Sequence, residues 1–306
     1  MSDIKLFRTD AKGVVELPSQ SMALERSLQS LMEKNLEALL GVRFLASEYS
    51  TGAKHKGRID TLGIDENGCP VIIEYKRNTN ENVINQGLFY LDWLMDHQAE
   101  FKLLVLEQLG KEAADEIEWG GPRLLCIAGD FTRYDEHAVL QMNRNIELIR
   151  YRHYPDGFLI LERVNSVTVE SVAAPSSHSH TGAKSKQVYT TVSQYLERAP
   201  EQVKSLYQDV EDLLLSLGDD VEKKVLKFYV AYKRIKNFAC VEVRVQAMCV
   251  VVYLKCPTTP DYIIDGFTRD VSNIGHFGTG DLEVTLRSKE DVERARHLFE
   301  LSYQAS

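Results

Sequence analysis

The sequence predicts an α/β fold for the first half of the chain, a mixed sheet flanked by helices, followed by a smaller α+β domain. Over residues 1–170, segments with helical spacing of apolar residues alternate with short extended segments. Residues 187–306 instead open with two helical segments and then run through several strands. Between these halves, 171–186 is rich in Ser, Ala, Gly and Lys, which predicts a flexible linker. A chain of 306 residues suits such a two-domain arrangement.

The first half begins with a predicted helix over 24–40, in which leucines recur at helical spacing and Gly41 is the stop signal. Residues 58–65 and 71–76 are extended segments, and Asn67-Gly68 between them is a strong hairpin signal. Three further helices are expected, at 82–97, 104–117 and 136–143. Further strands are expected at 44–49, 123–128, 147–152 and 158–162.

The second half is expected to form a separate α+β domain. Its apolar pattern predicts helices near 189–196, 203–217 and 291–303, with strands near 240–245, 248–254 and 282–286.

The composition indicates a soluble chain of the cytoplasm. The first residues are polar and charged, which is unlike a secretory signal, and the longest apolar run, 247–254, is far shorter than the roughly 18 residues that span a bilayer. The five cysteines form no CxxC pair and mostly lie in apolar runs, as expected of buried thiols in a reducing compartment. We therefore expect no membrane partner.

The net charge of −9 is unusual for a nucleic-acid binder. Residues 1–170 hold 19 Lys and Arg against 27 Asp and Glu, and the rest of the chain holds 17 against 18. A nuclease with this balance has to concentrate its basic residues locally, because neutralising phosphates supplies most non-specific affinity. Lys54, His55, Lys56 and Arg58 form one local cluster, although a solvated loop is the better explanation of that cluster taken alone.

The predicted hairpin brings two carboxylates together. With the turn centred on Asn67, the antiparallel register places Asp60 opposite Glu74, with side chains roughly 5 Å apart. Like charges in that position are destabilising, and a divalent cation held by the two carboxylates resolves the repulsion. Lys76 lies on the same strand face as Glu74, where its ammonium can act on attacking water or on phosphate charge. The alternative for this ExK triplet is a surface salt bridge.

The flanking helices carry further polar residues. In the first helix, Glu25 projects onto the core-facing stripe, where it can reach the metal site, whereas Glu33 and Glu37 project to the solvated side. The helix after the hairpin places Gln86 and Tyr90 on one face, which suits contacts to the lysine or to a phosphate. The alternative for Glu25 is a glutamate at the edge of the apolar stripe that extends into solvent. For Gln86 and Tyr90 it is the ordinary polar edge of an amphipathic helix.

Taken together, these residues resemble the PD-(D/E)XK nuclease core, a restriction-endonuclease-like fold. The matching runs are Gly57-Arg58-Ile59-Asp60, Asp65 to Gly68, Val71 to Arg77, and then Gln86 and Tyr90. Within that superfamily the chain is most similar to the RecB-like branch and to NucS-type mismatch endonucleases, over roughly residues 20 to 165.

The resemblance implies a DNA endonuclease that depends on Mg²⁺ or Mn²⁺. It implies metal ligands at Glu25, Asp60 and Glu74, a catalytic Lys76, and assisting side chains at Gln86 and Tyr90. Four basic residues flank the carboxylates where a scissile phosphate would lie: Lys54, Lys56, Arg58 and Arg77. NucS-type enzymes carry an N-terminal domain that binds DNA and dimerises, but only about twenty residues precede the first motif helix here. Mismatch recognition therefore does not carry over, and a homodimer stays open.

The second half resembles an uncharacterised α+β domain often attached to such nuclease cores and loosely labelled a transport protein. The matching residues include Tyr232-Lys233, Asn237-Phe238, Arg269 to Ser272, Gly275-His276 and Gly280 to Val284. Its aromatic and basic residues would suit a nucleotide pocket, although most of the aromatics fit a core. His276, on a Gly-rich loop, is the residue we expect to face a ligand.

Two functions from different classes remain. One is a metal-dependent nuclease acting on DNA, with RNA still open, in repair, restriction or defence against foreign DNA. The other is a nuclease-like fold that no longer cuts and binds nucleic acid or a partner protein. The presence of Asp60, Glu74 and Lys76 favours the enzyme, because loss of any one of them would indicate the silent module.

Overall fold

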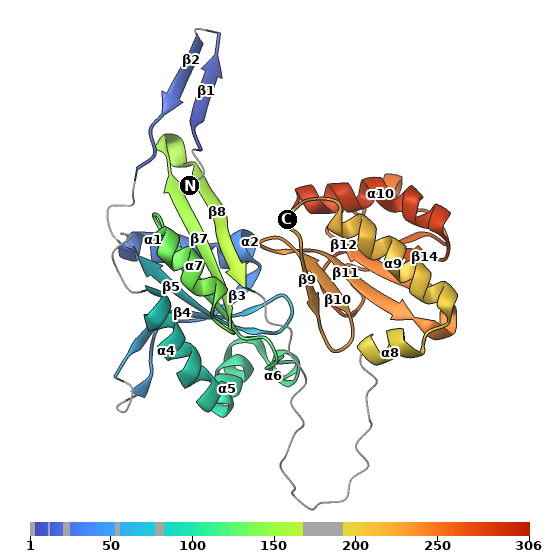
Figure 1. The fold of residues 1–306 in the computed structure, drawn as a ribbon, viewed down its shortest axis with the longest axis horizontal. Coiled ribbons are helices and arrows are strands. Elements are labelled where there is room, and N and C mark those ends of the chain that lie inside the picture. Colours follow the sequence, from blue (N-terminus) through green and yellow to red (C-terminus); the bar gives the residue numbers. More distant parts are fainter. Residues whose placement is uncertain (1–3, 12, 21–24, 53–55, 77–82, 168–191) are drawn as a thin grey trace, which may run out of the picture. The chain divides into compact units, whose positions relative to one another are not determined.

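The computed structural model describes residues 4–11, 13–20, 25–52, 56–76, 83–167 and 192–306. The chain divides into two compact units, Met1–Val169 and Glu170–Ser306 (Figure 1). The linker expected at 171–186 lies outside the described residues. Among the residues that are described, no helix is both long and apolar enough to cross a membrane.

The first unit is built on a six-stranded mixed sheet in the order β3-β4-β5-β6-β7-β8. The β5–β6 and β6–β7 pairs are parallel, and the other neighbouring pairs are antiparallel. The predicted fold class, a mixed sheet flanked by helices, is therefore confirmed. The strands are β3 (Val42–Ser50), β4 (Arg58–Asp65), β5 (Pro70–Lys76), β6 (Arg123–Ala128), β7 (Asn145–His153) and β8 (Leu159–Val167).

Helices cover both faces of this sheet. On one face, α4 (Val83–Asp96), α5 (Gln98–Leu109) and α7 (Arg133–Leu140) share a core with strand residues such as Leu62 and Ile72. On the other face, α1 (Glu25–Lys34) contacts Thr61, which has the opposite orientation to its neighbour Leu62. Two short helices, α2 (Leu36–Leu40) and α6 (Lys111–Asp115), complete the set in the described part of this unit.

Three helix predictions differ from the structure in detail. The helix expected over 136–143 lies three residues earlier, as α7. The single helix expected over 24–40 is two helices that meet at Asn35, although it does end at Gly41, whose φ of 64° is the left-handed conformation that glycine favours. The helix expected over 104–117 begins earlier, at Gln98, and is interrupted at Gly110. Only Phe101 and Val105 of α5 are buried, so its apolar periodicity gave a weak signal for the helix start.

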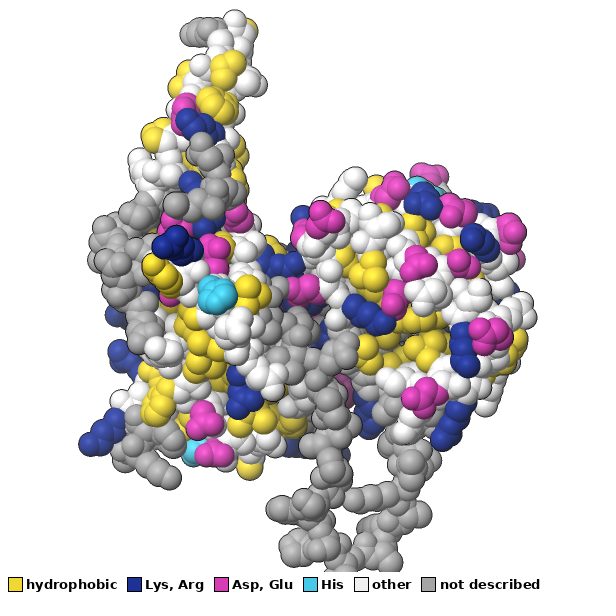
Figure 2. Space-filling view, viewed as in Figure 1, with side chains coloured by type: hydrophobic (Ala, Val, Ile, Leu, Met, Phe, Trp, Pro, Cys, Tyr) yellow, Lys and Arg dark blue, Asp and Glu magenta, His cyan; other side chains and the backbone are white. Residues whose placement is uncertain are grey.

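An N-terminal hairpin, β1 (Leu6–Asp10) and β2 (Gly13–Leu17), was not predicted. None of its apolar residues is buried, and Val14 is 67% exposed, so the hairpin lacks the buried face whose alternation reveals a strand. In the space-filling view, the hairpin carries apolar side chains between charged ones (Figure 2). An ion pair of 3.6 Å between Arg8 and Asp156 connects it to the main part of the unit.

The second unit contains a six-stranded antiparallel sheet in the order β13-β14-β12-β11-β10-β9. Helices α8 (Val192–Arg198), α9 (Glu201–Leu215) and α10 (Lys289–Gln304) match the three predicted helices within a few residues. Strands β11, β12 and β14 were predicted, whereas β9, β10 and β13 were not. The strands are β9 (Glu222–Val225), β10 (Val230–Lys233), β11 (Asn237–Arg244), β12 (Cys249–Leu254), β13 (Thr268–Asp270) and β14 (Leu282–Leu286).

A buried ion cluster joins three strands of the first unit. The Arg123 guanidinium, at the start of β6, donates to Asp65 of β4 at 2.9 Å and to Glu147 of β7 at 2.7 Å. Asp65 also accepts hydrogen bonds from the backbone N–H groups of Asn67 and Cys69 in the hairpin turn, both at 2.9 Å. All three charged side chains are at most 5% exposed, so each charge depends on its partners for compensation.

Replacing Arg123 with Ala should destabilise the protein by about 3–5 kcal/mol, because two buried carboxylates lose their counter-charge. Urea denaturation followed by circular dichroism measures the change. Arg144→Ala is the control, since this exposed arginine should change the stability by no more than about 0.5 kcal/mol. A loss below about 1 kcal/mol for Arg123→Ala would contradict the role that we assign to the cluster.

Candidate functional site

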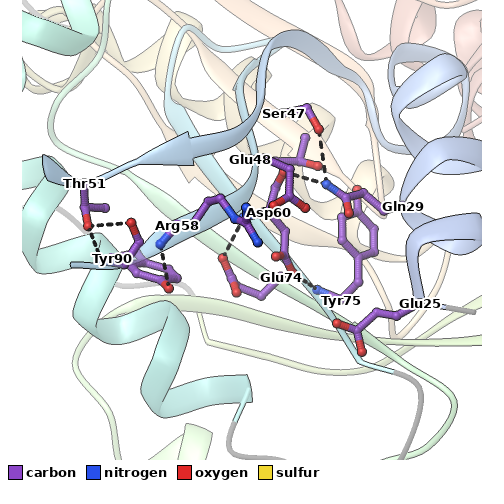
Figure 3. Close-up of polar contacts among 12 residues, drawn as sticks. Glu25, Gln29, Ser47, Glu48, Thr51, Arg58, Asp60, Glu74, Tyr75 and Tyr90 are labelled. Atoms are coloured by element: carbon purple, nitrogen blue, oxygen red, sulfur yellow. Dashed lines mark hydrogen bonds and ion pairs between the residues drawn. The ribbon is translucent and has the colours of Figure 1, made fainter. Parts of the chain in front are cut away.

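The hairpin register brings Asp60 and Glu74 together as predicted. Thr61 pairs with Ile73 and Leu62 with Ile72, so the next residues along β4 and β5 are Asp60 and Glu74. The Asp60 backbone N–H donates to Glu74 Oε1 at 3.2 Å, and the Tyr75 backbone N–H donates to Asp60 Oδ2 at 3.0 Å. Each carboxylate is thus bonded to the backbone of the opposite strand, and both lie between the two strands in the close-up (Figure 3).

Burial dominates the electrostatics of this pair. The Glu74 side chain is fully buried, and its Oε2 has no hydrogen-bond partner among the described residues. Burial, followed by repulsion from Asp60, raises the pKa of Glu74 to about 9. Burial also raises the pKa of Asp60, against the opposing effects of the Tyr75 N–H and the Lys76 charge. Without a cation, the site therefore holds at least one proton at neutral pH.

Lys76 lies at the end of β5 and pairs with Glu25 at the start of α1. Lys76 Nζ and Glu25 Oε1 are 3.2 Å apart, and the lysine side chain is only 12% exposed. Burial alone would lower the pKa of Lys76, but Glu25 and the two hairpin carboxylates outweigh it and raise the pKa. The lysine consequently stays protonated at physiological pH, with its charge next to the carboxylate pair.

The donors at this site suit a hard divalent cation held by two carboxylates. Glu74 offers an unpartnered buried oxygen and Asp60 offers a second carboxylate, and Mg²⁺ is usually held by one or two carboxylates with water completing its shell. The predicted third ligand, Glu25, contacts Lys76 through its Oε1. Among the described residues, no group of three or more His, Cys, Asp or Glu side chains is arranged to hold a metal. The structure brings Asp60 and Glu74 into contact, and the role of Glu25 as a third metal ligand stays a prediction.

Gln29 of α1 is a site residue that the sequence interpretation did not identify. It is 6% exposed, and its Nε2 donates to the backbone carbonyl of Asp60 at 2.8 Å and lies 3.2 Å from Ser47 Oγ (Figure 3). Glu33, one turn further along, accepts from Gln29 at 3.1 Å and from the Thr61 hydroxyl at 2.6 Å. The expectation that Glu33 faces solvent was therefore wrong, because the sheet-facing side of α1 also includes polar residues that bond to β4.

Tyr90 and Gln86 of α4 hold the start of β4. The Tyr90 hydroxyl accepts from the Arg58 backbone N–H at 3.1 Å and from Gln86 Nε2 at 3.4 Å, and Tyr90 is 6% exposed. Gly57 makes this approach possible, since a Cβ at that position would lie 2.5 Å from the Tyr90 ring. The two side chains were predicted to assist the lysine or a phosphate, and in the structure they fix the strand that carries Asp60.

The predicted basic residues are only partly described. Lys54 and Arg77 lie outside the described residues. Lys56 is exposed, with a φ of 50°, and Arg58 forms an ion pair of 2.5 Å with Glu48 of β3. On the face that Figure 2 shows, basic and acidic side chains of the described residues are interspersed. Because of its ion pair with Glu48, Arg58 already has a carboxylate partner for its positive charge.

Comparisons with known proteins give three findings. A family model described as "Domain of unknown function (DUF5655)" matches residues 192–306, the whole described part of the second unit. An uncharacterized protein of Haemophilus influenzae is 28% identical over 299 residues, which span 95% of this chain and 96% of that protein. Two solved structures are also similar in part.

One of these structures is a repair endonuclease from Pyrococcus abyssi, with a TM-score of 0.28 and 19% identity over 45% of this chain and 50% of the endonuclease. The other is a complex of EndoMS with double-stranded DNA, with a TM-score of 0.24 and 16% identity over 48% of this chain and 65% of that protein. The chain thus spans about half to two thirds of these structures, and both likenesses are distant. What this chain does has to be argued from its own residues.

The raised pKa of Glu74 predicts how stability depends on pH without metal. Between the ordinary value of 4.5 and about 9, the folded protein holds a proton that the unfolded chain has released. Stability should therefore fall as pH rises through this window, by on the order of a few kcal/mol. In EDTA, Glu74→Gln should flatten this fall, as measured by urea denaturation at pH 5, 7 and 9. Glu37→Gln, at an exposed position of α2, is the control. Equal slopes in wild type and Glu74→Gln would contradict the raised pKa.

Proposed function

We propose that the first unit is a divalent-metal-dependent nuclease that hydrolyses phosphodiester bonds of DNA. One observation carries the proposal: a fully buried glutamate with an unpartnered oxygen lies against a second carboxylate and next to a protonated lysine. An arrangement of this kind costs folding free energy unless something compensates it. Strong perturbation of neighbouring titratable groups is a mark of functional sites.

The compensation that fits best is a hard cation. Asp60 and Glu74 would hold it, and Mg²⁺ or Mn²⁺ suits their oxygen donors. Such an ion polarises a phosphoryl oxygen and lowers the pKa of bound water, which is the chemistry that phosphodiester hydrolysis needs. Glu25 is proposed to act mainly through Lys76, given their 3.2 Å contact.

The chain's own residues would supply positioning and charge. Lys76, held by Glu25, presents a permanent positive charge to a phosphate near the carboxylates. Gln29 holds the Asp60 backbone from one side of the sheet, and Tyr90 holds the start of the same strand. Small errors in placing catalytic groups reduce rates strongly, so these anchors are proposed to support the site by positioning the strand that carries Asp60.

DNA is proposed as the substrate despite the acidic composition of this half. Of the basic residues near the carboxylates, Lys56 is exposed and Arg58 is paired with Glu48. Lys54 and Arg77 are proposed to add phosphate contacts, on sequence position alone. Because this half carries an excess of acidic residues, long-range attraction to DNA should be weak, and binding should depend on these few local groups.

Asp60→Ala, Glu74→Ala and Lys76→Ala should each reduce cleavage at least about a hundredfold, because metal ligands and their partner charges each stabilise the transition state by several kcal/mol. Cleavage is measured on single-stranded, duplex, branched and modified DNA and on RNA, with Mg²⁺, Mn²⁺ or EDTA. Glu37→Ala, on the exposed side of α2, should cut at the wild-type rate. Wild-type protein that cuts none of these substrates with either metal would favour the silent binding module, and wild-type cleavage by Lys76→Ala would exclude its proposed role.

Glu25→Gln should give an intermediate loss, about tenfold, because it removes the charge that pairs with Lys76 but leaves both proposed ligands in place. The effect should be mainly on kcat, with metal affinity changed less than by Glu74→Ala. Single-turnover rates over a Mg²⁺ titration separate the two quantities. Glu37→Gln is the matched control, and Glu33 is unsuitable as a control because it bonds to Gln29 and Thr61. If Glu25→Gln weakened metal binding as much as Glu74→Ala, Glu25 would be a ligand after all.

A further inference from the structure

The sheet of the second unit has two chemically different faces. On one face, alternate residues of β12, Val250, Val252 and Leu254, join a core to which α8, α9 and α10 all contribute. Successive strand residues point to opposite faces, so Tyr253 belongs to the other face. The same alternation places Glu283 of β14 beside Tyr253 on that second face, since the two residues are cross-strand partners.

Four charged side chains form one network around Tyr253 on the second face. Arg244 Nη2 donates to Glu242 Oε2 at 3.0 Å and to the Tyr253 hydroxyl at 2.9 Å. Arg269 of β13 donates to Glu283 Oε2 at 2.8 Å, and Arg244 lies 3.7 Å from the same oxygen. The residues come from four neighbouring strands, β11, β12, β14 and β13, so the sheet itself holds their positions.

The network presents its cations outward. The Arg269 side chain is 55% exposed above Glu283, which is 6% exposed, and Arg244 is 38% exposed against 22% for Glu242. A ligand that approaches this face therefore meets guanidinium groups first, while the carboxylates beneath fix their orientation. Guanidinium groups held in this way are suited to binding phosphate through paired N–H donors.

Aromatic rings adjoin these guanidinium groups. The His276 ring stacks on Tyr253, with centroids 4.3 Å apart and planes at 11°, and it is only partly buried. Phe277 stacks on Phe228 at 4.6 Å and is itself 45% exposed. His276, which was expected to face a ligand, is thus accessible from this face of the sheet. Tyr232, another aromatic residue of this unit, is instead buried in the core. Exposed aromatic rings beside cations offer a stacking surface for a planar base.

Two adjoining cavities lie at this face and share Arg244, Arg269 and Glu283. The smaller, of about 160 Å³, is lined by His276 and Phe277 among others. The larger, of about 560 Å³, adds Arg287 together with the exposed Asp265. Together they lie in the range of roughly 300–1,000 Å³ that is typical of small-ligand sites. The aromatic and the cationic parts therefore open into neighbouring spaces.

We propose that this face of the second unit binds a nucleotide, with the base stacked at His276 and Phe277 and the phosphate at Arg269 and Arg244. A free nucleotide and a nucleotide within a single strand share this chemistry. An acidic peptide would use the arginines but would leave the stacked rings without a role. The site is complete within the second unit, so it does not depend on the nuclease activity proposed for the first.

The test is equilibrium binding to the full-length protein in EDTA, where cleavage does not interfere. The probes are adenosine monophosphate, adenosine, inorganic phosphate, a single-stranded DNA of ten nucleotides and a hexaglutamate peptide. The variants are Arg269→Gln and His276→Ala. Their controls are Arg296→Ala and His297→Ala, which change the same residue types at exposed positions of α10. Thermal melts establish that each variant is folded.

We expect Arg269→Gln and His276→Ala each to weaken nucleotide binding about tenfold or more, because each removes a charge-assisted contact or a stacking contact. The α10 controls should bind as wild type does, and adenosine and phosphate alone should bind more weakly than the monophosphate. A single strand that binds far more tightly than the monophosphate, and that both variants bind more weakly than the wild type does, identifies nucleic acid as the source. Equal affinity of the strand and the monophosphate identifies a free nucleotide.

Three results would overturn the proposal. One is wild-type affinity in either folded variant, and another is phosphate or hexaglutamate binding as tightly as the nucleotide. The third is the absence of binding by both the monophosphate and the single strand at millimolar concentration. If one variant does not fold, nucleotide binding by the other variant tests the proposal. This is possible because His276 and Arg269 lie on different segments and contribute different chemistry.

Discussion

The pairing of β4 with β5 forces the carboxylates of Asp60 and Glu74 against each other at a place where Glu74 is fully buried. Neighbouring groups of the first unit reduce the cost of this repulsion. Backbone N–H groups of the opposite strand bond to each carboxylate, and the Lys76 charge lies close by. At the other end of the same hairpin, Arg123 fixes the turn through Asp65. The fold thus maintains an arrangement that favours protonation in the absence of a cation and that a cation would stabilise.

Sequence patterns sufficed for the hairpin and its register because several independent signals agree there. Asn67-Gly68 defines the turn, apolar alternation defines the strands, and the side-chain period of two then determines which residues meet. The roles of Gln29 and Glu33 could not be predicted in this way. Their partners, the Asp60 carbonyl and the Thr61 hydroxyl, lie on a strand that is distant in sequence, and a helical projection gives no information about polar partners across an interface.

In the second unit, too, the sequence could not predict which aromatic residues lie in the core and which lie at the surface. Tyr232 and His276 are both aromatic residues in the part of the chain that resembles a known domain, yet one is in the core and the other lines a cavity. Composition alone could not separate them. The separation depends on the order of six antiparallel strands, three of which were not recognised because they are only three or four residues long. Short strands carry too few alternations to stand out from a loop.

The ion pair between Arg58 and Glu48 has a consequence for how binding would respond to salt. Where a phosphate displaces the carboxylate that lies 2.5 Å from Arg58 Nε, one anion replaces another on the same cation. A nucleic acid sheds its condensed counterions when it meets protein cations, but here the freed Glu48 carboxylate recruits cations from solution in turn. Ionic strength would then affect this contact less than a contact made by an unpaired lysine. Counting basic residues near the site would overestimate the salt sensitivity of the complex.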